Sequence, residues 1–178
     1  MSRVPFVPGE RTENESELVA RIRARRGGKL LNLDRMLLNS PSFAQGWNAH
    51  LGAVRRELLL EPRLRELAVC AIAVLNGADY ELAQHTPEFL RLGGTAAQAE
   101  ALTQFGMGTV DTATFDATER AILQLTLEMT RNVQVSDSTF ERVQSALSDT
   151  RQIVELVGVI ATYNMVSRFL VALQVDLE

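Results

Sequence analysis

The sequence predicts an all-α protein, a multihelical bundle, from three observations. No segment alternates apolar and polar residues with period two between turn signals, as half-buried strands do. Apolar residues recur instead three and four positions apart, for example at Phe43, Trp47, Leu51, Val54 and Leu58. Capping-box patterns punctuate the chain, with Thr95 followed by Gln98 and Asp116 followed by Glu119.

Residues 1–14 are expected to form an N-terminal arm, because Pro5 and Gly9 disfavour regular structure. Residues 15–178 are then expected to form one domain, since 178 residues suffice for a single sizeable core.

The first helix is predicted over residues 15–26. Gly27-Gly28 ends it, because glycine adopts a positive φ without steric cost. This helix carries a run of basic residues, which are Arg21, Arg23, Arg25 and Arg26. The run favours a solvated helix end that complements the dipole over an anion site.

Two helices follow over residues 30–38 and 41–59. Ser40 is predicted to cap the second, with Pro41 at its first position. Trp47 belongs to the apolar face of this helix and is expected in the core, whereas His50 is expected at the surface.

The stretch from Arg63 to Gly94 is predicted to be a pair of helices joined by a break at Asn76-Gly77. Antiparallel packing of the pair would set Glu66, ten residues before Asn76, nearly level with His85, nine residues after it.

The remaining helices are predicted over residues 95–105, 116–131, 136–147 and 150–175, with a loop over 106–114. Ser136 and Ser148 are the expected starts of the last two helices. The final helix is apolar nearly all round, which predicts burial at the centre or in a subunit interface.

The helical pair gathers the residues best suited to chemistry. Glu81 lies four residues before His85, and Cys70 lies four residues after Glu66. The two residues of each pair therefore share a helix face. Carboxylates beside an imidazole raise its pKa while burial opposes this, which allows proton exchange near neutral pH. A structural Glu–His pair explains the same spacing. A metal site is less favoured, because a second histidine at ligand spacing is lacking.

Composition narrows the class of protein. Hydrophobic residues make up 46% and charged residues 22%, as in soluble globular proteins. The net charge of −4 argues against nucleic acid as a partner. A single cysteine cannot form an internal disulfide and fits a reducing compartment.

No membrane association is expected. The start of the chain lacks the long apolar core of a secretory signal. The most apolar run, residues 153–175, is interrupted by Glu155, Asn164 and Arg168. A cytoplasmic location is therefore expected.

The stretch RELAVCAIAVLNGADYELAQH resembles the carboxymuconolactone decarboxylase family, which also includes the alkylhydroperoxidase D proteins. Glu66 and His85 match the glutamate and histidine of the peroxidase motif, and Ala78 and Glu81 occupy its two cysteine positions. Flanking segments are also similar, so the resemblance covers roughly residues 30 to 175. It implies an alkylhydroperoxidase D-like fold and a homo-oligomer, a trimer or hexamer.

The absent thiols direct the predicted chemistry away from peroxide reduction. The resemblance implies a cofactor-independent acid–base enzyme of the decarboxylase branch, without a metal, acting on a small organic acid or lactone. His85 would carry the proton, Glu66 would orient it, and Glu81 would assist.

Tyr80, Trp47 and Cys70 are predicted to bind the substrate, although the apolar neighbours of Cys70 also favour an ordinary core cysteine. The cation that would hold a substrate carboxylate stays open among Arg55, Arg56, Arg63, Arg65 and Arg91. The alternatives are a peroxidase that uses Cys70 and a non-catalytic oligomeric binding protein.

Overall fold

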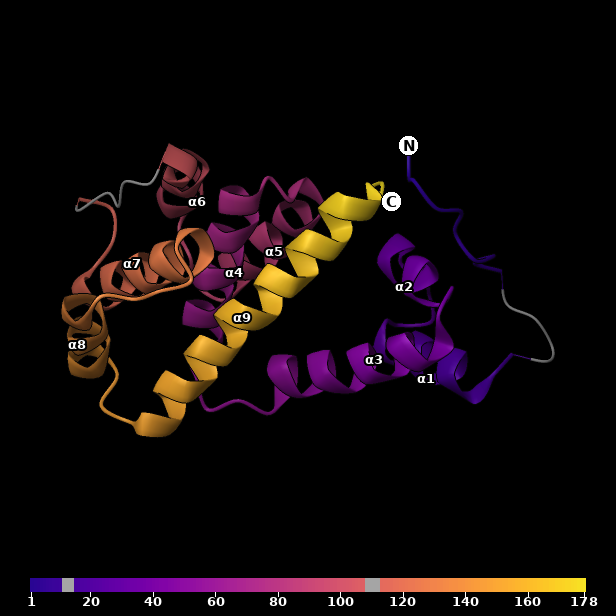
Figure 1. Ribbon diagram of the computed structural model, residues 1–178, viewed down its shortest axis with the longest axis horizontal. Coiled ribbons are helices and arrows are strands. Elements are labelled where there is room, and N and C mark those ends of the chain that lie inside the picture. The colour runs from indigo at the N-terminus through magenta and orange to yellow at the C-terminus, as the bar shows by residue number, and fades with distance from the viewer. Residues whose placement is uncertain (11–14, 108–112) are drawn as a thin grey trace. The chain divides into compact units, whose positions relative to one another are not determined.

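The computed structural model describes residues 1–10, 15–107 and 113–178, and every regular element in these ranges is a helix (Figure 1). The all-α prediction is therefore confirmed. The chain forms two compact units, one of Met1–Glu57 with Ala172–Glu178 and the other of Leu58–Val171. The prediction of one domain over residues 15–178 stays a prediction.

The first unit contains α1 (Glu17–Arg25), α2 (Asn32–Leu37) and α3 (Pro41–Arg56). Trp47 of α3 is buried as predicted. Phe43 is not a core residue, although it continues the same spacing, since 47% of its surface is exposed. Its ring instead packs edge-on against Trp47, with centroids 5.7 Å apart.

The C-terminal residues complete the first unit by pairing with its N-terminal part. The Arg3 amide donates to the Leu173 carbonyl at 2.9 Å, and the Ser2 amide donates to the Asp176 carboxylate at 3.0 Å. The arm thus has ordered contacts at its start, while residues 11–14 lie outside the described ranges.

The second unit is built from consecutive helices. They are α4 (Pro62–Asn76), α5 (Asp79–Arg91), α6 (Ala96–Gln104), the short 3₁₀ helix η1 (Phe105–Met107), α7 (Ala117–Arg131), α8 (Asp137–Ala146) and most of α9 (Thr150–Leu173). Helix α4 forms the centre of this unit, because nearly every residue from Leu64 to Leu75 is buried. The predicted loop over 106–114 falls partly on residues 108–112, outside the described ranges.

The capping boxes form as predicted at α6 and α7. Thr95 Oγ1 accepts from the Gln98 amide, and Asp116 Oδ1 accepts from the Glu119 amide at 2.8 Å. Each satisfies an amide that the first helical turn leaves without a partner.

Ser40 is the N-cap residue of α3 and Pro41 its first residue, as predicted, but the Ser40 side chain makes no capping hydrogen bond. The predicted start of α9 is wrong. At α9 the acceptor for the first-turn amide of Arg151 is Asp149 Oδ1, at 2.7 Å, and not Ser148. Aspartate and serine both serve as caps, and the sequence pattern does not distinguish adjacent candidates.

Helix α9 crosses α4 and α5 diagonally within the second unit (Figure 1). Leu156, Ile160 and Tyr163 are fully buried, whereas Val154 and Met165 are exposed, so only one face is central. By length and composition α9 meets the criterion for a membrane-crossing helix, with a mean hydropathy of 1.7. Half of that window is buried inside the fold, as in the core helix of a soluble protein, so the signal is weak.

Candidate active site

The α4–α5 hairpin brings the predicted residues together. Gly77 caps α4 in the left-handed region, with φ of 61°, and the Ala78 amide bonds back to the Ala73 carbonyl at 2.8 Å. This tight reversal returns α5 antiparallel to α4. Glu66 and His85 consequently face each other across the hairpin.

Glu66 is the centre of a short chain of polar contacts. Its Oε2 lies 2.5 Å from His85 Nδ1, and its Oε1 accepts from Arg65 Nε at 3.1 Å. Glu66 and His85 are 2% and 7% exposed, so solvent screens their interaction little. A carboxylate at Nδ1 orients the imidazole and directs Nε2 away from α4.

Glu81 approaches the other ring nitrogen of His85. Its Oε2 lies 3.3 Å from His85 Nε2, within ion-pair distance. The same oxygen is shielded from solvent and has no aligned hydrogen bond. The contact is therefore electrostatic, looser than the contact with Glu66, and leaves hydrogen-bonding capacity on Glu81.

The cluster favours a protonated histidine. Burial acts to lower the pKa of His85, but the hydrogen bond of Glu66 and the charges of Glu81 and Glu66 outweigh it and raise that pKa. Burial likewise acts to raise the pKa of Glu66, but His85 and then Arg65 outweigh it and lower that pKa. When it is protonated, His85 is a proton donor held between two carboxylates.

Helix α9 contributes a contact that the sequence pattern did not single out. The Tyr163 ring packs edge-on against His85, with centroids 5.1 Å apart and planes at 87°. Tyr163 is fully buried and closes one side of the imidazole. The signal available in the sequence was the polar run Thr162–Asn164 inside an otherwise apolar helix.

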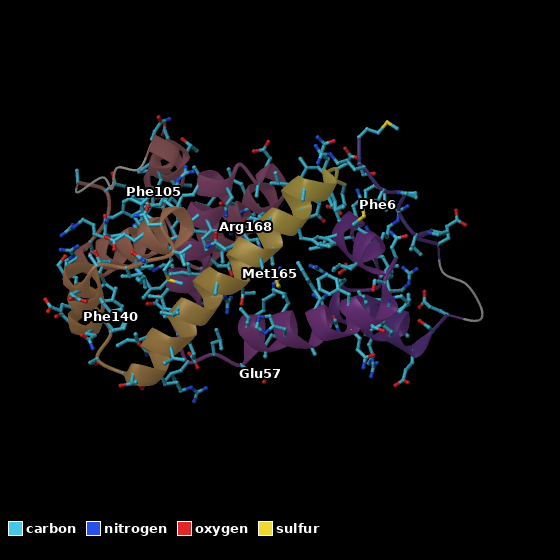
Figure 2. All side chains as sticks on the ribbon, viewed as in Figure 1. Phe6, Glu57, Phe105, Phe140, Met165 and Arg168 are labelled. Carbon is cyan, nitrogen blue, oxygen red and sulfur yellow. The ribbon has the colours of Figure 1, made fainter. Side chains whose placement is uncertain are left out.

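The neighbouring residue fixes α9 at this place. Asn164 Oδ1 accepts from Asn76 Nδ2 at 3.1 Å, and its amide nitrogen donates to Thr130 Oγ1 at 3.0 Å. Arg168, labelled on α9 in Figure 2, donates to Asn164 Oδ1 at 2.6 Å. Asn164 therefore ties α9 to the end of α4 and to α7, which sets the position of Tyr163.

Cys70 lies one turn after Glu66 but belongs to the hydrophobic core. Its buried neighbours include Leu67, Leu75 and Phe89. Burial raises the pKa of the Cys70 thiol to about 12, with the charges of Glu66 and Glu81 adding to the effect. The thiol is therefore protonated near neutral pH.

The other predicted lining residues are placed differently. Tyr80 is buried on α5, one residue before Glu81. Trp47 is a core residue of the first unit. Their predicted contact with substrate stays a prediction.

Arg65 is the arginine that adjoins the cluster, through Glu66. Arg63 instead bonds Glu119, and Arg91 bonds Glu88. The two remaining candidates, Arg55 and Arg56, end α3 in the first unit.

A cleft of the second unit lies elsewhere, between α7 and α8. It has a volume of about 970 Å³ and is lined by residues that include Arg120, Gln124, Glu141 and Arg142. Among the described residues, no group of three or more His, Cys, Asp or Glu side chains is arranged to hold a metal ion.

Comparison with solved structures shows which fold the chain adopts. A peroxidase-related protein from Silicibacter sp. TM1040 superposes with a TM-score of 0.81 at 18% identity, over 99% of this chain and 92% of that one. An alkylhydroperoxidase AhpD core protein from Ralstonia eutropha JMP134, also peroxidase-related, gives 0.77 at 18% identity, over 99% and 92%. A variant of the debrominase Bmp8 in complex with 2,3,4-tribromopyrrole gives 0.78 at 16%, over 100% and 94%. The alkylhydroperoxidase D-like fold is thereby confirmed.

The sequence also matches a family model over part of the chain. Residues 41–104 match the model of the Carboxymuconolactone decarboxylase family. The resemblance predicted from the motif is confirmed, and the match contains Glu66, Glu81 and His85. No curated protein matches the chain significantly.

Proposed function

We propose that this protein is a cofactor-independent acid–base enzyme in which His85 transfers a proton to or from a small organic acid or lactone. The observation that carries the proposal is the arrangement of His85 between two carboxylates, 2.5 Å from Glu66 and 3.3 Å from Glu81. General acid–base groups need such tuning of their pKa values.

A decarboxylation would proceed as follows at this site. The bond between the substrate carboxylate and the ring carbon breaks, CO₂ leaves, and the electron pair delocalises toward a conjugated carbonyl. His85 Nε2 then delivers its proton to a distant carbon of that conjugated system. A solvent proton restores the imidazolium, and Glu66 holds Nδ1 throughout. Because the site is dry, the substrate carboxylate loses its hydration shell on binding, which favours its departure as CO₂.

The test is a thermal-shift screen of small carboxylic acids and lactones, followed by turnover assays that detect CO₂ release or proton exchange. His85→Asn is expected to lower turnover by about 10²–10⁴-fold, the usual contribution of a general acid. The matched control is His50→Asn, which removes the other histidine at an exposed position of α3. Turnover that is equal in His85→Asn and the wild type contradicts the proposal.

Glu66 is proposed as a positioning residue, and its test needs a readout that a purely structural role would not change. If protonated His85 is the acid, the rate falls as pH rises through the pKa of His85. Glu66→Gln removes a charge that raises this pKa, so the alkaline limb of the pH–rate profile is expected at lower pH. A limb that keeps its position excludes this role.

A non-catalytic binding protein is the second candidate. The observation that favours it is burial, since only 7% of His85 is exposed and a buried Glu–His pair also stabilises a hairpin. Binding of a small acid without turnover, unaffected by His85→Asn, is the expected result in that case.

Peroxidase activity is disfavoured by the state of Cys70. Its thiol is buried, its pKa is raised to about 12, and the sequence holds no second cysteine to resolve an oxidised sulfur. Hydroperoxide consumption with a thiol reductant that is lost in Cys70→Ser would reinstate this alternative.

A further inference from the structure

Two buried polar atoms of the second unit have no hydrogen-bond partner among the residues that the structure describes. They are Glu81 Oε2 on α5 and Ser167 Oγ on α9, in residues that are 2% and 1% exposed. A buried polar group without a hydrogen bond costs free energy. Such groups are few in native proteins, and catalytic groups are among them.

Helix α9 runs in the same direction as α4. Near the start of α9, Glu155 Oε2 accepts from the amide of Leu60, just before α4, at 2.8 Å. Further along α9, Asn164 bonds Asn76, the last residue of α4. Because α5 is antiparallel to α4, α9 also runs opposite to α5. Successive turns of α9 therefore pass the turns of α5 in reverse order.

This order brings Ser167 and Glu81 to the same side of one contact between the two helices. The contact joins the rings of Tyr163 and His85, whose centroids are 5.1 Å apart. Ser167 is one turn after Tyr163 on α9, and Glu81 is one turn before His85 on α5. The two unpartnered atoms thus come from facing helices at the same level, without a hydrogen bond between them in this arrangement.

The proposed chemistry requires Glu81 to move. His85 Nε2 is the atom that delivers the proton, and Glu81 Oε2 lies 3.3 Å from it. A substrate atom has to come within hydrogen-bond distance of Nε2, so it displaces this carboxylate. Glu81 is buried, and a displaced carboxylate in the interior needs another donor.

We propose that Ser167 is a positioning residue whose hydroxyl receives the Glu81 carboxylate when a substrate takes its place at His85 Nε2. This inference rests on the proposed acid–base function. Ser167 Oγ donates to Glu81 Oε2 in the displaced arrangement, so both unpartnered atoms gain a partner. One carboxylate thus alternates between His85 and Ser167, and Ser167 acts on the reaction through Glu81.

The same exchange links Ser167 to the titration of His85. The charges of Glu81 and Glu66 raise the pKa of His85. When His85 loses its proton, Glu81 loses the attraction that holds it there and turns to Ser167. Ser167 therefore stabilises neutral His85 and opposes the rise of its pKa. The other charged or titratable groups at the site, unchanged in a Ser167 variant, are Glu66 and Arg65 on α4, Glu88 on α5 and Tyr163 on α9.

The first test is an NMR titration of His85 in the full-length protein, which needs neither substrate nor turnover. His50→Asn assigns the remaining histidine signal to His85. The pKa of His85 is expected to rise in Ser167→Ala and to fall in Glu81→Gln. In the double variant it is expected to equal that of Glu81→Gln alone, because Ser167 acts through Glu81. A pKa that does not rise in Ser167→Ala, or that rises equally without Glu81, overturns the proposal.

Turnover gives the second readout. Ser167→Ala is expected to lower kcat by about tenfold or more, because a hydrogen bond to a charged group is lost. Ser167→Thr keeps the hydroxyl and is expected to restore most of the rate. The alkaline limb of the pH–rate profile is expected at higher pH in Ser167→Ala, opposite to its shift in Glu66→Gln. A kcat and a limb that both stay unchanged contradict the role of Ser167.

The two proposals fail in different ways. Turnover that His85→Asn leaves unchanged removes the proposed function, whereas the NMR titration still tests the exchange of Glu81 between its two partners. Turnover that depends on His85 but not on Ser167 keeps the proposed function and removes the role of Ser167.

Stability separates this role from a structural one. Ser167 Oγ has no partner in the fold as described, so Ser167→Ala is expected to leave the melting temperature unchanged or to raise it. The matched control is Thr126→Val, which removes a buried hydroxyl that donates to the Ile122 carbonyl at 2.8 Å. This control is expected to lower the melting temperature. An equal loss in both variants would show that Ser167 serves the fold instead.

Discussion

The Glu66–His85 pair makes stability depend on pH. The pKa of His85 is raised above its ordinary 6.5, so its contribution is complete below pH 6.5 and is lost as pH rises through the folded-state pKa. The pKa of Glu66 is lowered below its ordinary 4.5, so its contribution is complete above pH 4.5 and is lost as pH falls through the folded-state pKa. The pair therefore stabilises the fold most between pH 4.5 and 6.5.

This dependence can be tested by comparing the unfolding free energies of the wild type and His85→Asn, measured by urea denaturation from pH 4.5 upward. Breaking the buried pair is expected to destabilise the variant by about 3–5 kcal/mol at its worst. The difference is expected to shrink as pH rises above 6.5, because the unfolded wild type then releases the proton that native His85 still binds, until the folded-state pKa is passed. Two curves that stay parallel above pH 6.5 would show that His85 is neutral in the native fold.

The burial of the Cys70 thiol can be tested by its reactivity. A protonated thiol in the core is expected to resist a thiol-reactive dye in the native protein and to react fully after denaturation. The measurement is dye release with and without denaturant. Fast native labelling would contradict the burial of Cys70 and its raised pKa of about 12.

Among the elements, the end of α5 depends on a glycine for steric reasons. A Cβ on Gly94 would lie 2.5 Å from the ring of Phe89, which is fully buried. Gly94→Ala is therefore expected to destabilise the protein by about 1–3 kcal/mol, as overpacking does. The measurement is thermal or urea unfolding.

The control for this substitution is Gly46→Ala in α3. Gly46 has nothing within 4 Å of a built Cβ and lies inside a helix. Alanine at this position is expected to stabilise the protein by about 1 kcal/mol, because alanine has a higher helix propensity than glycine. Equal effects at Gly46 and Gly94 would mean that Phe89 moves aside.

Much of the arrangement of helices along the chain was predictable from the sequence, because apolar spacing indicates the helices and capping residues and glycines indicate their ends. The approach of Glu66 to His85 was also predictable. The two residues are nearly the same number of positions from the break at Gly77, so an antiparallel hairpin brings them level with each other. The contact between Tyr163 and His85 was not, because it depends on how α9 is rotated over α5. Periodicity defines the buried side of a helix without naming its neighbour. The exposure of Phe43 escaped prediction for the same reason.

For the whole molecule, the predicted trimer or hexamer stays a proposal. Its support is the exposed apolar side chains of α9, which include Val154, Met165 and Val171. Light scattering coupled to size exclusion is expected to give three or six times the chain mass of 19.7 kDa. A mass of one chain would contradict both states.

The hydrogen bonds between the two chain ends bear on the order in which the protein folds. Arg3 pairs with Leu173, so during synthesis the first unit is completed only after the residues of the second unit have been made. In the second unit α4 packs against α5 and α7 against α8, each the next helix along the chain. These pairs can assemble earlier, because closing short loops costs less entropy. The hairpin that holds Glu66 and His85 is thus expected to acquire hydrogen-exchange protection before α1 to α3 in a pulse-labelling experiment.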